Sequence, residues 1–322
     1  MYGLELAGED DAFAAREAAC AARDVEVVAP GLATARGVDT DRFRTLAYTH
    51  RAIHLLGQCA ASVDAARAVV DAASLSRSGT VAVRARDVRS TAGVDTRRAE
   101  RALGATLVDR GFDVDLDDPD HELRVLFAAD TCLVGWLVAE SVRDYGARRP
   151  TDRPFFQPGS MAPLDARALV NLTGVEPGET LLDPMCGTGG VLIEAGLVGA
   201  HAVGVDAQRK MVRGARENLR AHLDTDFDLV RGDASRLPLA DDAVAGVVFD
   251  APYGRQSKIA RHSLSDLVSG ALAEAHRVAP RAVVVADRSW VEAARAAGWT
   301  VETTFERRVH RSLTRHILLL ER

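Results

Sequence analysis

Three aspartates that end predicted strands are the residues with the clearest chemical potential in the chain. Asp183 opens the glycine-rich segment 183–190, where a backbone without Cβ atoms can turn sharply and approach a ligand. Asp206 and Asp233 end the next two predicted strands. The carboxylate of Asp206 can accept hydrogen bonds from both hydroxyls of a ribose, and that of Asp233 can accept one from an adenine amino group. One such acid is more often a strand-end cap, but three in succession beside a glycine loop favour a ligand site.

The glycine loop departs from the fingerprint of dinucleotide-binding proteins. That fingerprint, G-x-G-x-x-G, requires a third glycine for close packing of helix on strand. Counting from Gly187, its sixth position holds Leu192. The missing glycine counts against NAD or FAD as the ligand of this loop.

The elements that position these acids alternate between strand and helix. Strands with nearly continuous apolar character, such as 244–249, are typical of a parallel sheet covered on both faces, so the second half predicts a doubly wound α/β domain. Ligands of such sheets bind beyond the carboxyl ends of the strands, where the acids fall. The predicted strands are 180–183, 202–206, 227–233, 243–250, 282–286, 300–305 and 315–320, and the predicted helices are 190–198, 209–223, 264–278 and 290–297.

The first half mixes short strands and helices and ends in a polar segment with two prolines, residues 145–154, which we interpret as an interdomain linker. Period-two alternation predicts a strand over 80–86, and strands are also expected over 123–127 and 132–138. Asp95 is a candidate cap for a helix that ends at Gly111. This pattern predicts an α+β module. Six arginines against three acids between residues 84 and 101 indicate that it presents an arginine-bearing face.

Length and composition fit a soluble protein of two domains. The chain has 322 residues, 47% of them hydrophobic, and a formal net charge of −6, which for a nucleic-acid enzyme requires local basic clusters. No apolar run approaches the roughly 18 residues of a membrane span, and the N-terminus lacks the pattern of a signal peptide. The four cysteines are scattered without a CxxC pair. We therefore expect no metal site, no disulfide framework and a cytoplasmic location.

The strand-end acids and the glycine loop together resemble the motifs of class I S-adenosylmethionine methyltransferases, and the resemblance covers residues 155–322. It implies a Rossmann-like, doubly wound, mostly parallel sheet with S-adenosylmethionine as cofactor. The methionine part would lie at the first strand end and its loop, the ribose at the second strand end and the adenine near the third. The implied cofactor-binding residues are Asp183, Cys186, Gly187, Gly189, Asp206, Asp233 and Ala234, with Cys186 as a small packing residue rather than a nucleophile.

The fourth strand is followed by Asp250, Ala251, Pro252 and Tyr253, which resemble the (Asp/Asn)-Pro-Pro-Tyr motif of amino-methyltransferases. The lone pair of an exocyclic amine is delocalised into its ring, so the amine is a poor nucleophile. A carboxylate and the neighbouring main-chain carbonyl can each accept one N–H and turn the lone pair out of plane, and the carboxylate stabilises the charge that develops on nitrogen. The tyrosine would stack on the base.

Position 251 departs from this motif, because alanine stands in place of the first proline. Pro252 still disfavours helical conformations at residue 251 and keeps it extended. The acceptor carbonyl is therefore expected to keep its direction, and a proline restored at 251 is expected to be tolerated.

Two further resemblances narrow the expected substrate. Residues 83–86, the arginine-rich helix after them and residues 123–125 look like a THUMP domain, an RNA-binding module of tRNA-modifying enzymes. Residues 153–163 look like the lead-in of THUMP-bearing guanine-N2 methyltransferases, and the whole chain resembles the archaeal enzymes that mono- and dimethylate guanosine ten of tRNA. The implied RNA-binding residues are Arg84, Arg86, Arg97 and Arg98.

The resemblance gives a domain plan with a ferredoxin-like segment at 1–60, a THUMP domain at 61–150 and a methyltransferase domain at 151–322. The expected partner is tRNA, bound by a monomer without membrane association. Three alternatives remain open: amine methylation of another nucleic-acid base, such as adenine N6 or another tRNA or rRNA guanosine; methylation of a protein glutamine; and a catalytically silent RNA-binding homologue marked by Ala251.

Overall fold

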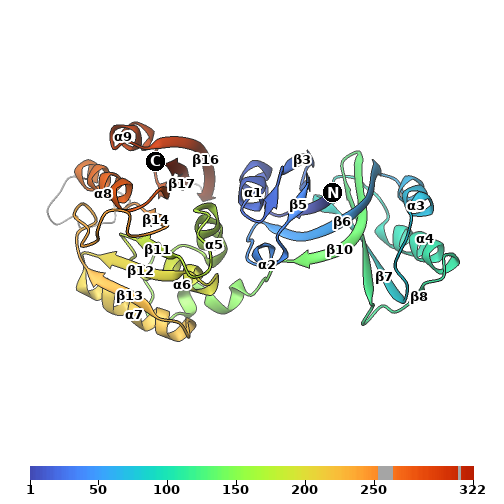
Figure 1. The fold of residues 1–322 in the computed structure, drawn as a ribbon, viewed down its shortest axis with the longest axis horizontal. Coiled ribbons are helices and arrows are strands. Elements are labelled where there is room, and N and C mark those ends of the chain that lie inside the picture. Colours follow the sequence, from blue (N-terminus) through green and yellow to red (C-terminus); the bar gives the residue numbers. More distant parts are fainter. Residues whose placement is uncertain (253–263, 311–312) are drawn as a thin grey trace. The chain divides into compact units, whose positions relative to one another are not determined.

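The computed structural model describes residues 1–252, 264–310 and 313–322. Its internal contacts divide into two units, Met1–Val142 and Arg143–Arg322, and each unit is built around its own large sheet (Figure 1). No helix in these described ranges is long and apolar enough to cross a membrane.

Unit 1 contains an eight-stranded sheet in the order β3-β4-β1-β6-β10-β9-β7-β8. The sheet continues across the predicted boundary at residue 60, because the long strand β6 pairs along its length with β10. The division of this unit into segments 1–60 and 61–150 stays a prediction. The strands are β1 (Tyr2–Leu6), β3 (Glu26–Ala29), β4 (Leu32–Ala35), β6 (Thr49–Ala60), β7 (Thr80–Asp87), β8 (Asp113–Val114), β9 (His121–Ala128) and β10 (Thr131–Glu140), with a separate pair β2 (Ala22–Arg23) and β5 (Gly37–Val38).

Four α-helices accompany this sheet: α1 (Asp11–Ala18), α2 (Thr40–Phe43), α3 (Val63–Ala72) and α4 (Thr96–Asp109). Helices α3 and α4 form a core with one face of β6, β7, β9 and β10, and Figure 1 shows the two helices side by side on that face. The prediction for α4 is confirmed, since the Asp95 carboxylate accepts the Arg98 N–H at 3.1 Å. Such a cap satisfies a backbone donor that the first helical turn leaves free.

Unit 2 contains a seven-stranded sheet in the order β13-β12-β11-β14-β15-β17-β16, in which the first five strands run parallel and β17 runs antiparallel to its neighbours. The chain moves outward from β11 to β13 and then returns to the other side of β11, so the topological switch lies between β11 and β14. The predicted mostly parallel, doubly wound sheet is confirmed. The strands are β11 (Thr180–Asp183), β12 (His201–Asp206), β13 (Phe227–Arg231), β14 (Gly246–Asp250), β15 (Arg281–Ala286), β16 (Thr300–His310) and β17 (Leu313–Glu321).

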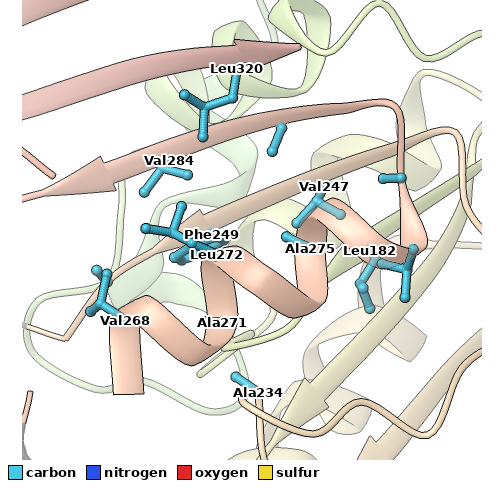
Figure 2. Close-up of a cluster of buried hydrophobic side chains, with 14 of the residues drawn as sticks. Leu182, Ala234, Val247, Phe249, Val268, Ala271, Leu272, Ala275, Val284 and Leu320 are labelled. Carbon is cyan, nitrogen blue, oxygen red and sulfur yellow. The ribbon is translucent and has the colours of Figure 1, made fainter. Parts of the chain in front are cut away.

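Helices cover both faces of this sheet. Figure 1 shows α6 and α7 on one face and α8 and α9 on the other, and α5, which the sequence did not predict, packs beside α6. Figure 2 shows the core on the α8 face, where Phe249 of β14 lies by Leu272 of the helix and Val247 lies by Ala275, and all four are fully buried. The helices are α5 (Pro163–Leu172), α6 (Gly190–Leu197), α7 (Arg209–His222), α8 (Leu264–Val278) and α9 (Val291–Ala296).

Candidate active site

Three aspartates end the three neighbouring strands at the switch point of unit 2. Asp183 is the last residue of β11, Asp206 the last of β12 and Asp250 the last of β14. Strands β12 and β14 flank β11 in parallel register, so the three carboxyl groups lie along one edge of the sheet. This arrangement brings together two residues expected to hold a cofactor and the acid expected to meet the substrate.

Asp183 occupies the centre of this acidic edge and is only 3% exposed. Burial raises the pKa of its carboxyl well above the ordinary value, because it disfavours the charged form, and the nearby Asp206 and Asp250 carboxylates raise it further. The hydrogen bond from the Met185 N–H, at 3.0 Å, acts in the opposite direction. A buried acid between two other acids is stabilised in its charged form by the arrival of a cation.

Asp206 ties the glycine loop to the second strand. Its two carboxylate oxygens accept the Gly187 N–H at 3.0 Å and the Gln208 N–H at 2.8 Å. Burial raises the pKa of this carboxyl, and the two N–H donors partly offset that effect. Each oxygen retains acceptor capacity beyond these bonds, so the side chain can hold the loop and still accept ligand hydroxyls.

The three glycines of the loop are needed for different physical reasons. Gly187 has φ +50°, and a Cβ placed on it would meet only the Met185 carbonyl oxygen, 4.0 Å away. A Cβ on Gly189 would lie 2.5 Å from Leu219 Cδ1, and one on Gly190 would lie 2.9 Å from Arg153 Nη1. The last two glycines therefore permit close packing within the protein, and Gly187 is the glycine that leaves open space for a ligand.

The remaining predicted cofactor residues take more local roles. Asp233 lies two residues beyond β13, where one of its carboxylate oxygens accepts the backbone N–H of Ser235 at 2.9 Å and its hydroxyl at 2.7 Å. Ala234 is buried in the hydrophobic core, so it can meet a ligand only through its backbone. Cys186 is buried as well, and burial raises the pKa of its thiol well above the ordinary value. This agrees with its interpretation as a packing residue.

The predicted amine-binding motif continues directly from β14. Ala251 is buried against the core, and its N–H donates to the Val285 carbonyl of β15 at 2.7 Å. Proline has no N–H, so a proline at this position would remove that bond. This bond is a physical reason to expect that proline at 251 lowers stability, against the expectation from the family pattern. Pro252 is half-buried, and Tyr253, the predicted stacking residue, lies outside the described residues.

Residues 155–160, which precede β11, are attached to the glycine loop by hydrogen bonds of Asn218. This residue was not among those predicted from the sequence. This fully buried side chain of α7 accepts the Phe155 N–H at 2.8 Å and donates to the Phe155 carbonyl at 2.8 Å and to the Thr188 carbonyl at 2.9 Å. The hydroxyls of Ser160 and Thr188 lie 3.1 Å apart. Residues 155–160 and the loop thus form one hydrogen-bonded unit.

The segment predicted as a polar linker is also held inside unit 2. Glu194 of α6 is fully buried, and its carboxylate accepts two hydrogen bonds from Arg148, at 2.8 and 3.1 Å, and lies 2.8 Å from Arg167 of α5. Arg148 also pairs with Asp144 at 2.9 Å, and its carbonyl accepts the Arg153 Nε–H at 3.1 Å. One sequence signal was available for this cluster, since Glu194 is the single charged residue in the otherwise apolar helix α6.

The four arginines predicted to bind RNA do not share a surface in unit 1. Strand β7 turns Val81 and Val83 toward α4, and because side chains alternate along a strand, Arg84 and Arg86 point to the opposite face. Arg97 and Arg98 are exposed on α4 itself. The expectation of one arginine-bearing face is therefore corrected, because the sheet separates the two pairs.

The pair on β7 is already bound to acids. Arg86 lies 2.9 Å from the buried Glu5 carboxylate, and Arg84 lies 3.8 Å from Glu122 and donates to the Leu116 carbonyl at 2.5 Å. Burial opposes ionisation of Glu5, but a hydrogen bond from His50 and the charges of Arg86 and Arg51 lower its pKa to about 2. Arg97 and Arg98 are thus the more available of the four for an external anion.

A doubly wound sheet in this strand order, with acids and a glycine loop at its switch point, defines a class I methyltransferase fold. In the described part of the chain, no three His, Cys, Asp or Glu side chains are arranged to hold a metal ion. The family model described as "RMKL-like, methyltransferase domain" matches residues 150–317, and that of the THUMP domain matches residues 63–136. The chain belongs to the RMKL-like methyltransferase family and carries a THUMP domain in unit 1.

Two relatives named as tRNA methyltransferases match most of the chain. The tRNA (guanine(10)-N2)-dimethyltransferase of Methanothermobacter thermautotrophicus is 39% identical over 291 residues, which are 87% of this chain and 84% of that protein. The enzyme of the same name from Pyrococcus abyssi is 31% identical over 252 residues, 76% of this chain and 74% of its own. Among solved structures, TrmN from Thermus thermophilus matches 100% of this chain and 99% of its own with a TM-score of 0.53 at 21% identity, which shows the shared fold.

Proposed function

We propose that the protein transfers methyl groups from S-adenosylmethionine to the exocyclic N2 amine of a guanosine in tRNA, with guanosine ten as the target. The observation that carries the proposal is the acidic edge, where Asp183, Asp206 and Asp250 end three adjacent strands beside an open glycine. The relatives from Methanothermobacter and Pyrococcus, named for this reaction, support the choice of substrate. The monomeric state and cytoplasmic location expected from the sequence are part of the same proposal.

The residues present fit this cofactor. Burial and neighbouring acids raise the pKa of Asp183 more than the Met185 N–H lowers it, so the site favours a ligand that brings positive charge. S-adenosylmethionine carries both a sulfonium and an ammonium group. Gly187 offers open backbone, and Asp206 offers acceptor capacity for ribose hydroxyls. Asp233 and the Ala234 backbone would lie near the adenine. When bound, the cofactor supplies an electrophilic methyl group.

The chain itself would orient and activate the amine. Asp250 would accept one N–H of the guanine amine and the carbonyl of residue 251 would accept the other, which directs the nitrogen lone pair toward the methyl group. Burial of Ala251 and the bond from its N–H to the Val285 carbonyl support this role, because they restrain the backbone of the residue. A carboxylate held at this point also stabilises the positive charge that develops on nitrogen, an effect that is strong in a site without bulk water.

RNA binding would begin on unit 1. The exposed Arg97 and Arg98 of α4 would contact phosphates, whereas Arg84 and Arg86 would first have to leave their internal partners. Phosphate contacts position a nucleic acid without reading its sequence, so the THUMP domain would select the target by distance. The base would then leave its stack to enter the pocket.

Methyl transfer to tRNA tests the proposal directly. Incubation with S-adenosylmethionine labelled in its methyl group should transfer label to unmodified tRNA, and nucleoside mass spectrometry should identify N2-methylguanosine or its dimethyl form. Label in N6-methyladenosine would overturn the assignment of the base, and label that survives RNase would indicate a protein substrate. Binding of tRNA and cofactor without any transfer would identify a silent homologue.

A further inference from the structure

Helix α7 carries a line of exposed basic side chains along its whole length. Arg209, Arg213, Arg216 and Arg220 are all exposed and follow one another at intervals of four, three and four residues. At 3.6 residues per turn these positions fall within about 60° of one another and span roughly 16 Å along the helix axis. We call this set the α7 stripe.

The packing of α7 fixes the direction of this stripe. Gly214, Ala215 and Asn218 are buried on the side of the helix that faces away from the stripe, and Leu219, on its flank, packs against the glycine loop. The buried Asn218 adds its three hydrogen bonds on the inner side. The helix therefore cannot rotate the arginines inward, and they form a rigid row of positive charge on unit 2.

Local acids do not neutralise this row. The helix contains one acid, Glu217, which lies 3.3 Å from Arg213, a side chain that is 81% exposed in this pair. Arg216 donates to the Leu229 carbonyl at 3.4 Å, and the adjacent strand contributes another exposed arginine, Arg231, bound to the Ala207 carbonyl at 3.1 Å. Carbonyl contacts leave the charge of a guanidinium uncompensated.

Several other arginines of unit 2 have acid partners. Arg307 and Arg315 share the Asp165 carboxylate at 3.1 and 3.3 Å. Arg281 and Arg295 each have an acid of their own, Glu321 and Glu292. The chain has a net charge of −6, so a helix with four aligned arginines and one acid differs in charge from the rest of the protein. Such a surface is suited to a polyanionic partner.

We propose that the α7 stripe binds the phosphodiester backbone of the RNA substrate, as a second RNA contact on the methyltransferase unit. The inference rests on the proposed function for the identity of the substrate. Aligned guanidinium groups on a rigid helix match a row of phosphates, and each contact releases a condensed counterion. The stripe acts on RNA affinity and not on the chemical step, because its side chains point away from the glycine loop beside the acidic edge.

Salt-dependent kinetics with full-length protein test the stripe. The triple variant Arg213→Gln, Arg216→Gln, Arg220→Gln should raise KM for tRNA at least tenfold near 0.15 M salt. It should also flatten the plot of log affinity against log salt by about two units, since each lost phosphate contact removes roughly 0.7–0.9 from the slope. The turnover number at saturating tRNA and the Kd for S-adenosylhomocysteine should stay within twofold of wild type.

A matched control removes the same charge from elsewhere on unit 2. The variant Arg281→Gln, Arg288→Gln, Arg295→Gln changes three exposed arginines that pair with Glu321, Asp287 and Glu292. It should leave KM and the salt slope near wild type. An equal effect of both variants would show that only net charge matters, and an unchanged slope in the stripe variant would show that the helix does not touch RNA. Either result overturns the proposal.

Direct binding separates this inference from the proposed function. If wild-type protein transfers no methyl group to tRNA, the proposed reaction is wrong. Fluorescence anisotropy with labelled tRNA still measures the contribution of the stripe, through the Kd for tRNA and its dependence on salt. The single reversal Arg220→Glu provides a second variant with minimal risk to folding, because this side chain is exposed near the end of α7. It should weaken binding severalfold, and wild-type affinity would count against the stripe.

Discussion

Two buried acids of unit 2 occupy opposite electrostatic situations. Glu194 is enclosed with the guanidinium groups of Arg148 and Arg167, both within hydrogen-bonding distance. Asp183 is equally buried, but its charged neighbours are the carboxylates of Asp206 and Asp250. The first carboxylate has its counterions supplied by the chain, whereas the residues that the structure describes place only acids among the charged neighbours of the second.

The difference separates structure from function. A buried carboxylate with two cations stabilises the fold only while all partners are present, because removal of one leaves an uncompensated charge. A buried carboxylate among other acids destabilises the unliganded fold and gains its counterion from a ligand. We therefore assign Glu194 to attachment of the 143–153 segment and Asp183 to the cofactor, and the two assignments predict mutational effects of opposite sign.

The largest expected effect on stability comes from Glu194→Gln. The variant removes the anion from the buried Arg167 and leaves Arg148 with the exposed Asp144 as its acid partner, so the free energy of unfolding should fall by about 3–5 kcal/mol. Chemical denaturation followed by circular dichroism measures this change. Glu321→Gln, which removes an exposed partner of Arg281, is the control and should cost less than about 1 kcal/mol. Similar small losses for both variants would contradict a structural role for Glu194.

The largest expected effect on catalysis comes from Asp250→Ala. Loss of the proposed acceptor for the amine should lower turnover at least a hundredfold, by analogy with removal of one preorganised charge-stabilising group, which costs about 3–4 kcal/mol. Calorimetry should find the affinity for S-adenosylhomocysteine within a few fold of wild type. Retention of more than a tenth of the wild-type rate would show that another group accepts the amine proton.

The acidic edge could be predicted from sequence because its determinants are local. Asp183, Asp206 and Asp250 each close an apolar segment, and the topology of a doubly wound sheet brings such strand ends together without any knowledge of side-chain contacts. The order of the strands then decided which of the acids became neighbours. Asp233 shows the limit of this approach, since β13 ends at Arg231 and leaves the acid in a turn.

The Glu194 cluster could not be predicted because its determinants are distant in sequence. Arg148 and Glu194 are separated by 46 residues, and nothing in the polar composition of residues 145–154 distinguishes a solvated linker from a docked segment. Composition reports average exposure, whereas burial of an arginine depends on whether an anion lies opposite. The same reason explains Arg84 and Arg86, whose partners Glu122 and Glu5 come from other strands.

A smaller effect, on binding alone, is expected for Asp206→Ala. The variant removes the proposed charged acceptor of the ribose hydroxyls, an interaction of about 1.5–3 kcal/mol, so the Kd for S-adenosylmethionine should rise roughly ten- to a hundredfold. The Gly187 N–H also loses its acceptor, which is a further reason for weaker binding. Unchanged affinity in a folded variant would remove Asp206 from the cofactor site.

The substitution Ala251→Pro examines the backbone of the same edge. The variant removes the N–H that donates to the Val285 carbonyl at 2.7 Å and leaves that carbonyl without its partner, which should lower stability by about 1–3 kcal/mol. Turnover should fall as well if the strand end shifts. Ala251→Ser is the control, because it keeps the N–H. Wild-type stability of the proline variant would show that the bond contributes nothing.

A gradual effect, spread over a range of pH, is expected for the stability contribution of Asp183. Its pKa in the folded, unliganded protein lies well above the ordinary value of 3.8, mainly because of burial, so the native state holds a proton that the unfolded state has lost in the interval between the two values. Stability of the unliganded protein should therefore decrease as pH rises through that interval, by at most about 1.4 kcal/mol per pH unit for one proton. Asp183→Asn should remove this slope and make the unliganded protein at least as stable as wild type at pH values above that interval, the reverse of the effect at Glu194.

The same linkage requires a cationic cofactor to release a proton on binding to wild type, which calorimetry in buffers of different ionisation enthalpy measures directly. Proton uptake, or an unchanged slope in Asp183→Asn, would mean that the buried acid does not exchange its proton for the ligand's charge.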